Sequence, residues 1–309
     1  MKISLLLVLA LFLFITQADL YAGVEIVDYR GWRGCYRLFN QNTEVIINPH
    51  TGARVMVFAH KGQNIIHENP DQDGTNFEEW KESPFDPDGG RLDYGPEMET
   101  RRIHALTWMG PWEVEVTGAF SLRMNSTSDQ KLGLVSQRIF SLDPGTGKLT
   151  ITQIGENISA DTLVRHFWGR TLVKPGGIMM LPLATENSRF EQGVGKFAWN
   201  PNRIEENPEE DERLWIKGGI LHFHAIGSTY KAGTDAKAGW MSYQLGQLRM
   251  VKRFPVFAEA SYEGSEHMTG IFYSNGRFAE MEPCGPTRKL APGESFSFTE
   301  EWELEVLAN

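Results

Sequence analysis

The sequence predicts an all-β protein, a large two-sheet antiparallel supersandwich, on three observations. Apolar and polar residues alternate with a period of two in many short segments. Pro- and Gly-containing turn signals separate these segments, and no window of about 12 residues has an apolar period of 3.6. Alternation predicts strands with one face in a core and one in water. Many short strands between turn signals are typical of a sandwich or barrel, so helix should be scarce.

The clearest alternation lies in 113–116, 149–152 and 301–306. Further strands are expected at 43–47, 53–59, 134–142, 164–173, 178–183, 220–225, 240–245, 247–254 and 268–273. Turns are expected at 48–52, 143–147, 174–177 and 291–293, where Pro, Gly or Asn occur together. No internal repeat and no linker interrupts this pattern. We therefore interpret 23–309 as a single β-supersandwich domain.

The N-terminus predicts a secretory signal peptide over 1–22. Lys2 precedes an almost unbroken apolar run over 3–15, and small residues follow at Ala18 and Ala22. A membrane anchor is the alternative, but a spanning helix needs about 20 apolar residues and this run has 13. Cleavage is expected after Ala22 or after Ala18. We therefore expect a secreted or periplasmic protein with no membrane insertion after signal cleavage.

Charge and cysteine content narrow the classes of partner. Forty acidic and 30 basic residues give a net charge of -10, which argues against nucleic acid and anionic membranes. Cys35 and Cys284 form either a disulfide or two buried thiols. His222 and His224 share a strand face, but two ligands without a third do not predict a metal site. No cofactor and no metal are expected.

Tryptophans and a glycine-rich segment suggest a carbohydrate site. The nine Trp residues offer flat apolar faces with a polar edge, which suit the C–H faces of sugar rings, although most should be core residues. Trp108 and Trp112 lie in a segment with Gly and Pro, and Trp199 is a further candidate for the rim of the site. Arg91 follows Gly89 and Gly90, where the backbone can approach a ligand and the guanidinium can donate to it. A surface turn is the alternative interpretation of that segment.

Two strand-like segments carry the candidate catalytic groups. His166, Trp168 and Arg170 alternate in 165–170 and would share one face of a strand. Glu280 and Glu282 alternate in the same way in the apolar, proline-bounded segment 278–286. Carboxylates on a strand usually face solvent, but these surroundings favour a carboxylate held for function.

The order of these elements resembles the galactose mutarotase-like superfamily, which contains the aldose 1-epimerases, and is closest to a secreted bacterial branch of it. The resemblance is carried by the strand pair at 43–47 and 53–59, the segment 89–92, His166 followed by aromatic residues, the segment 282–286, and the closing segments 290–294 and 301–302. It covers nearly all of 23–309. These motifs are short.

The resemblance implies that Arg91 contacts sugar, that His166 is the general acid and that Glu282 is the general base. The chain also departs from the family pattern. Val164-Arg165 stand where epimerases place Thr-Asn, and Pro283-Cys284 stand where they place Thr-Gln. The first active-site histidine of the family has no clear match, and His104 is a candidate for it.

Three functions are compatible with these residues. The first is a sugar 1-epimerase or isomerase, and the second is a non-catalytic carbohydrate-binding protein on the same fold. The third, a lyase or hydrolase, would need a helical catalytic domain for which the pattern leaves no room. In each case the partner is a small-molecule or polymeric carbohydrate. The expected site is a cleft lined by the following residues: Arg91, His166, Trp168, Arg170, Glu280 and Glu282, with Trp108, Trp112 or Trp199 at its rim.

Overall fold

The computed structural model describes residues 22–100, 105–184, 186–197, 204–205 and 211–308. Of these residues, 51% are in strands and 9% in helices, which confirms the predicted all-β class. The predicted signal segment, apart from Ala22, lies outside the described residues, as do His104 and Trp199. No helix within the described ranges is long and apolar enough to cross a membrane.

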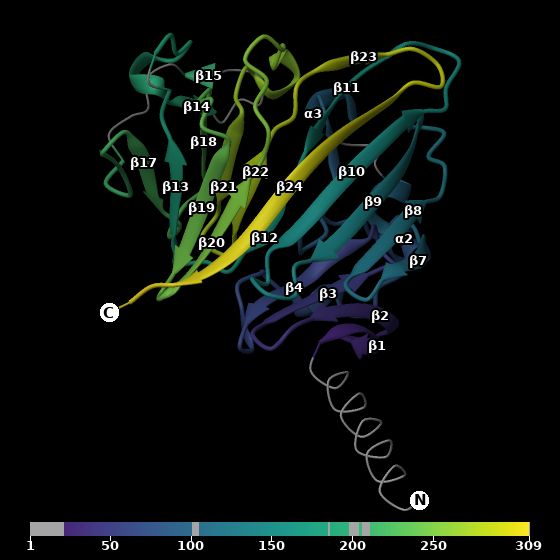
Figure 1. The fold of residues 1–309 in the computed structure, drawn as a ribbon. Coiled ribbons are helices and arrows are strands. Elements are labelled where there is room, and N and C mark those ends of the chain that lie inside the picture. Colours follow the sequence, from purple (N-terminus) through teal and green to yellow (C-terminus); the bar gives the residue numbers. More distant parts are fainter. Residues whose placement is uncertain (1–21, 101–104, 185, 198–203, 206–210, 309) are drawn as a thin grey trace, which may run out of the picture.

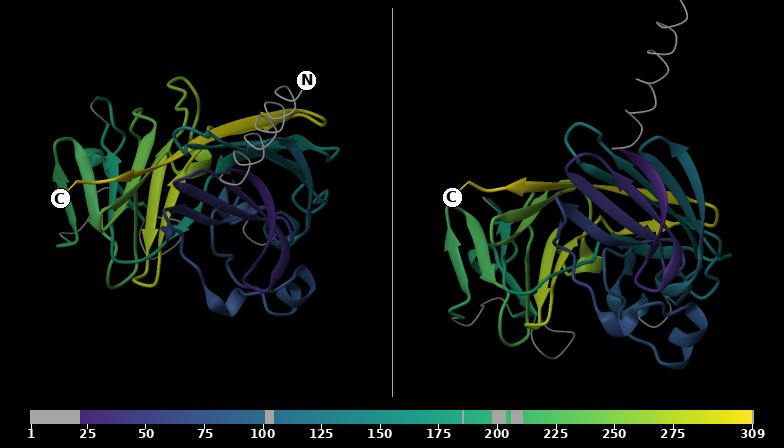
Figure 2. Two further views of the ribbon diagram at one scale, coloured as in Figure 1. Left: turned by 60° about the horizontal axis from the view of Figure 1, so that its bottom comes forward. Right: turned by 90° about the horizontal axis from the view of Figure 1, so that it is seen from below.

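The largest sheet has ten strands (Figure 1). Its order is β16 (Leu214–Lys217), β17 (Ile220–His224), β13 (Ile178–Pro182), β19 (Trp240–Leu245), β20 (Leu248–Arg253), β24 (Ser295–Val306), β10 (Leu149–Asn157), β9 (Leu134–Leu142), β8 (Ser121–Ser126) and β7 (Trp112–Gly118). Its neighbouring strands pair antiparallel. The long strand β24 lies at its centre and runs across the whole molecule (Figures 1 and 2).

Three smaller antiparallel sheets complete the fold. One contains β1 (Gly23–Tyr29), β2 (Trp32–Phe39), β3 (Thr43–Asn48), β4 (Arg54–His60) and β5 (Gln63–Asn64). The second has the order β23 (Arg288–Leu290), β11 (Leu163–Trp168) and β6 (Asp93–Gly95). The third has the order β12 (Thr171–Val173), β22 (Ala279–Pro283), β21 (Gly270–Ser274), β18 (Tyr230–Thr234), β14 (Gly195–Phe197) and β15 (Ile204–Glu205).

Isolated bridges join the smaller sheets. Ile66 pairs with Val173 of β12, which links the five-stranded to the six-stranded sheet, and Trp168 of β11 pairs with Cys284 just after β22. The helices are short: α2 (Phe77–Glu82), α3 (Glu97–Thr100), α4 (Ala105–Met109), η1 (Pro70–Gln72), η2 (Glu191–Gly193) and η3 (Glu263–Ser265). The joined sheets therefore form a second layer, and the helices lie in its connections.

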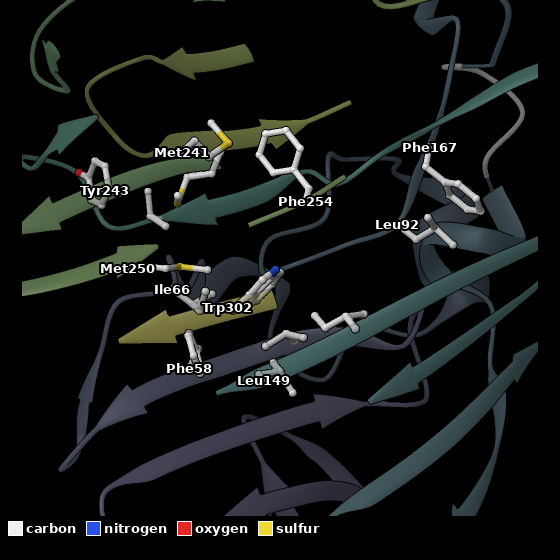
Figure 3. Packing of buried hydrophobic residues seen from close by; sticks show 14 of the residues in the cluster. Phe58, Ile66, Leu92, Leu149, Phe167, Met241, Tyr243, Met250, Phe254 and Trp302 are labelled. Atoms are coloured by element: carbon white, nitrogen blue, oxygen red, sulfur yellow. The ribbon is translucent and has the colours of Figure 1, made fainter. Parts of the chain in front are cut away.

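The main hydrophobic core lies between the two layers. Leu149 of the ten-stranded sheet and Phe58 of the five-stranded sheet belong to one buried cluster, together with Met250 of β20 (Figure 3). Trp302 of β24 is 1% exposed, and its ring meets the ring of Phe58 edge-on at 5.8 Å. The apolar positions of the alternating segments therefore face one another, and their burial drives the two layers together.

One predicted strand is broken in the structure. The segment 164–173 forms β11 and β12, which are separated by Gly169 and Arg170 and pair with different strands. Gly169 donates to the carbonyl of Pro283 at 2.9 Å, and a Cβ at this position would lie 2.0 Å from Glu300 Oε1. A larger residue at this point would displace Glu300, and the break leads Arg170 to the pocket described below.

The two cysteines are free thiols. Cys35 is buried in a cluster with Trp32 and Met56, and Cys284 is buried in another with Trp168. Of the two alternatives left open by the sequence, the structure has the pair of buried thiols.

Candidate functional site

A pocket of about 1190 Å³ lies over the six-stranded sheet. On its floor, Lys231 of β18 is directly opposite Tyr273 of β21, and Tyr273 is directly opposite Glu280 of β22. Directly opposed residues in antiparallel strands project on the same face, so these three side chains form a row. All three line the pocket.

A pair of carboxyl groups forms one end of this row. Glu280 and Glu282 alternate on β22 and therefore share a face. Glu280 lines the pocket and is 7% exposed, whereas Glu282 is 0% exposed. Trp168 Nε1 donates to Glu282 Oε2 at 2.8 Å, but no described residue donates to Glu282 Oε1. Oε1 of Glu282 is therefore buried without a hydrogen-bond donor among the described residues.

The pKa of Glu280 differs strongly from that of an ordinary glutamate. Burial is the main cause that raises the pKa of Glu280 to about 8, and the charge of Glu282 and a hydrogen bond to it act in the same direction. The Arg170 guanidinium opposes this shift. At neutral pH the shift favours the protonated form of Glu280, whose carboxyl group lines the pocket.

Two cations lie beside the carboxyl pair and over the Trp168 ring. The Arg170 guanidinium is 4.4 Å from the ring centroid, and its Nε is 3.2 Å from Asp93 and 3.8 Å from Glu280. Lys231 Nζ is 4.8 Å from the same centroid and 3.7 Å from Glu282. The positive charges of Arg170 and Lys231 offset part of the free-energy cost of burying a negative charge on the carboxyl pair.

Glu97 connects the two cations at the pocket wall. One of its oxygens is 3.4 Å from Arg170 Nη2 and the other is 3.7 Å from Lys231 Nζ. Asp93 and Glu97 follow the segment 89–92, from which Arg91 was expected to contact sugar, within the next five residues. This part of the chain does reach the site, and its carboxylates contact Arg170.

Arg91 lies behind the pocket rather than in its wall. It is 1% exposed, its Nε donates to Asp93 at 3.1 Å, and its guanidinium is 4.7 Å from the centroid of the Trp108 ring. Asp93 therefore lies between the two arginines: it accepts a hydrogen bond from Arg91 and forms an ion pair with Arg170 at 3.2 Å. Arg91 is joined to the site through Asp93.

His166 does not line the pocket. Its side chain is fully buried, with Nδ1 3.0 Å from the carbonyl of Phe167 and its ring 6.1 Å from the ring of Trp168. A Cβ on Gly95 would lie 1.7 Å from its Nε2, so backbone encloses the ring closely. Burial lowers the pKa of His166 to about 4, and the ring is neutral at neutral pH.

The tryptophans expected at the rim lie elsewhere. Trp108 packs with Trp80 and Met109 in a cluster around α2 and α4, and Trp112 lies in the main core with 4% exposure. Neither lines the pocket, because both bury their apolar rings against neighbouring elements. Trp168 touches the site through its indole N–H, and Trp199 lies outside the described residues.

Sequence reasoning missed several pocket residues. Lys231 lies on the short strand β18, and Tyr273 ends a segment that was expected only as a strand. Alternation places each of them on a face, but only strand pairing shows that this face adjoins Glu280. Among the described residues, no group of three or more His, Cys, Asp or Glu is arranged to hold a metal ion.

Comparisons with known proteins give structural matches only. No protein-family model matches the chain, and no curated protein sequence matches it. A galactose mutarotase-like protein from Lactobacillus casei has a TM-score of 0.58 at 11% identity, covering 88% of this chain and 100% of that one. A galactose mutarotase-like protein from Clostridium acetobutylicum has a TM-score of 0.58 at 14% identity, covering 93% of this chain and 99% of that one.

A TPR-domain containing protein from Parabacteroides distasonis also matches, with a TM-score of 0.59 at 14% identity. The match covers 87% of this chain but only 46% of that protein, so this chain spans less than half of its length. At such identities the likeness concerns the fold alone. It confirms the predicted supersandwich architecture.

Proposed function

We propose that this chain, which has the galactose mutarotase-like fold, binds a carbohydrate over Glu280 and acts as a sugar 1-epimerase. The observation that carries the proposal is the pair of carboxyl groups of Glu280 and Glu282 at the wall of the pocket, where burial raises the pKa of Glu280. Interconverting two anomers requires a group that gives a proton and a group that takes one. The pair provides both.

Ring opening would use Glu280 as the group that faces the sugar. One oxygen of Glu280 gives its proton to the ring oxygen while the other accepts the proton of the anomeric hydroxyl. The bond between the anomeric carbon and the ring oxygen breaks, and an aldehyde forms. The aldehyde rotates and the ring closes by the reverse transfer, so the pair ends with the proton it began with.

Glu282 would act on Glu280 rather than on the sugar, because Glu282 is fully buried. Its charge adds to the effect of burial in raising the pKa of Glu280, while Arg170 opposes that shift and Lys231 lies 3.7 Å from Glu282. The assignment from the sequence, with Glu282 as base and His166 as acid, is the alternative within this proposal. The enclosed position of His166 argues for Glu280 as the acid.

Three variants test the proposal by polarimetry of freshly dissolved aldoses. Glu280→Gln should lower turnover by about 10²–10⁴, the size of an acid–base contribution. Glu282→Gln should lower turnover at pH 7 and recover it at lower pH, because Glu280 then loses its proton more easily. His166→Gln should leave the turnover of the folded protein near that of the wild type. A loss with His166→Gln as large as that with Glu280→Gln would instead support histidine as the acid.

A non-catalytic carbohydrate-binding protein is the second candidate function. The observation in its favour is that His166, the acid implied by the resemblance, does not line the pocket. In that case no aldose would mutarotate faster in the presence of the wild type. Calorimetric titration would still detect sugar binding, and Glu280→Gln would weaken it by about 1–3 kcal/mol, the scale of a hydrogen bond to a charged group.

A further inference from the structure

An aromatic patch continues the pocket floor beyond Glu280. Phe278 precedes Glu280 by two residues, so its side chain lies on the same face of the chain, roughly 7 Å further along. Its ring centroid is 5.4 Å from that of His67 and 6.0 Å from that of Tyr273. All three rings are partly exposed and line the pocket. We call His67, Tyr273 and Phe278 the aromatic patch.

The backbone holds the members of the patch in place from three separate segments. The backbone N–H of His67 donates to the backbone carbonyl of Leu172 in β12 at 2.9 Å, and Leu172 is directly opposite Glu280. Tyr273 is directly opposite Glu280 on the other side. Burial is the main cause that lowers the pKa of His67, so its ring is uncharged at neutral pH. The patch is therefore a neutral aromatic surface built beside the carboxyl pair.

Polar side chains that can form hydrogen bonds with sugar hydroxyls line the same pocket, close to the patch in the sequence. Asn69, Asn275 and Arg277 line the same pocket, and their side chains carry amide and guanidinium donors. Pockets that hold one small molecule are about 300–1,000 Å³, and this one is about 1190 Å³. A single sugar ring at Glu280 would adjoin Tyr273 but leave the far side of the patch, His67 and Phe278, uncovered.

We propose that the pocket binds at least two linked sugar residues, the reducing residue at Glu280 and its neighbour against the aromatic patch. The assignment of the reducing residue rests on the proposed function. The assignment of the second residue rests on the patch itself, because flat apolar rings with polar groups at their edge suit the C–H face of a sugar. The preferred ligand class is thus a reducing oligosaccharide.

The test compares matched sugars that share the same reducing residue: glucose with cellobiose and maltose, xylose with xylobiose, and mannose with mannobiose. Calorimetric titration and polarimetry are run on wild type, Phe278→Ala, Phe278→Leu and the control Phe257→Ala. Phe257 is 50% exposed and does not line the pocket. At least one disaccharide should bind the wild type about tenfold more tightly than its monosaccharide, which corresponds to about 1.4 kcal/mol.

Phe278→Ala should weaken disaccharide binding much more than monosaccharide binding and so remove this advantage, whereas Phe257→Ala should change neither affinity. Phe278→Leu keeps a bulky apolar side chain but has no ring. It should lose the same advantage while staying folded, which would attribute the loss to the ring rather than to misfolding. Equal affinity of the wild type for both members of every pair would overturn the second sugar position. So would a Phe278→Ala loss of the same size for both members.

The two proposals fail separately in this design. Disaccharide preference without any acceleration of mutarotation would leave the aromatic patch standing and refute the epimerase. Faster mutarotation with equal affinity for monosaccharides and disaccharides would support the epimerase and refute the second sugar position. No binding of any sugar in the panel would refute both.

Discussion

At the scale of single residues, the site depends on one carboxyl group whose protonation is set by its neighbours. Glu280 is largely buried beside the fully buried Glu282, and an ionised pair would place two negative charges close together in a poorly solvated region. Arg170 and Lys231 supply positive charge, but each is shared with Glu97. The pair therefore keeps a proton that an exposed glutamate would lose.

This proton makes stability depend on pH. The pKa of Glu280 is about 8 in the folded protein, compared with 4.5 for the ordinary group. Between these values the folded state binds a proton that the unfolded state has lost, so stability falls as pH rises from about 5 to 8. The slope from one group is at most about 1.4 kcal/mol per pH unit.

Urea unfolding of wild type and Glu280→Gln between pH 5 and pH 8.5 measures this effect. The variant should lose the downward slope and gain stability relative to wild type as pH rises. Glu113→Gln, which changes an exposed carboxylate on β7, is the matched control and should follow the wild type. Parallel curves for wild type and Glu280→Gln would contradict the raised pKa.

At the scale of elements, the site depends on the break between β11 and β12. Behind the break, Lys252 Nζ donates to the carbonyl of Gly169 at 2.9 Å and to that of Met281 at 3.4 Å. Met281 lies between Glu280 and Glu282, and Lys252 also pairs with buried Glu300 at 3.0 Å. The buried ion pair of Lys252 and Glu300 thus holds the backbone at the break between β11 and β12 and the backbone of β22.

Gly169→Ala should therefore be strongly destabilising. The added Cβ would lie 2.0 Å from Glu300 Oε1, and the buried ion pair would have to move. We expect a loss of about 2–4 kcal/mol in the free energy of unfolding, from overpacking and from a disturbed buried charge. Gly145→Ala is the matched control, because a Cβ there meets only Asp143 Oδ1 at 3.5 Å. Similar denaturation midpoints for both variants would contradict this packing.

At the scale of the whole molecule, two layers enclose separate hydrophobic clusters. The main cluster joins the ten-stranded sheet to the smaller sheets, while Cys35 and Cys284 belong to two other clusters. Both thiols have zero exposure, and burial raises the pKa of Cys35 to about 12 and that of Cys284 further. A buried thiol that keeps its proton is a poor nucleophile.

Thiol titration checks this arrangement. Without reductant, the native protein should react with no equivalent of an aromatic disulfide reagent, and the denatured protein should react with two. Cys35→Ala should leave one reactive thiol after denaturation. A denatured protein with no reactive thiol would show that the two cysteines are joined instead.

The sequence predicted those parts of the site that belong to one strand. Alternation places Glu280 next to Glu282, and it places Trp168 and Arg170 near each other, because side chains two residues apart share a face. It did not predict that Gly169 breaks this segment, since the reason is a contact with Glu300, which is 131 positions away in the chain. Nor did it show that Trp112 is a core residue rather than a residue at the rim of the site, because an apolar ring suits either position.

The sequence by itself determined the all-β class, most strand positions and the carboxyl pair, because these follow from local alternation and turn residues. Only the tertiary structure decided which strands are neighbours. That pairing places Lys231 and Tyr273 beside Glu280 and gathers the aromatic patch. It also encloses His166 away from the pocket and separates the two thiols. The physical reason is that strand pairing and burial depend on residues far apart in the chain, whereas alternation reports only the face on which a side chain lies.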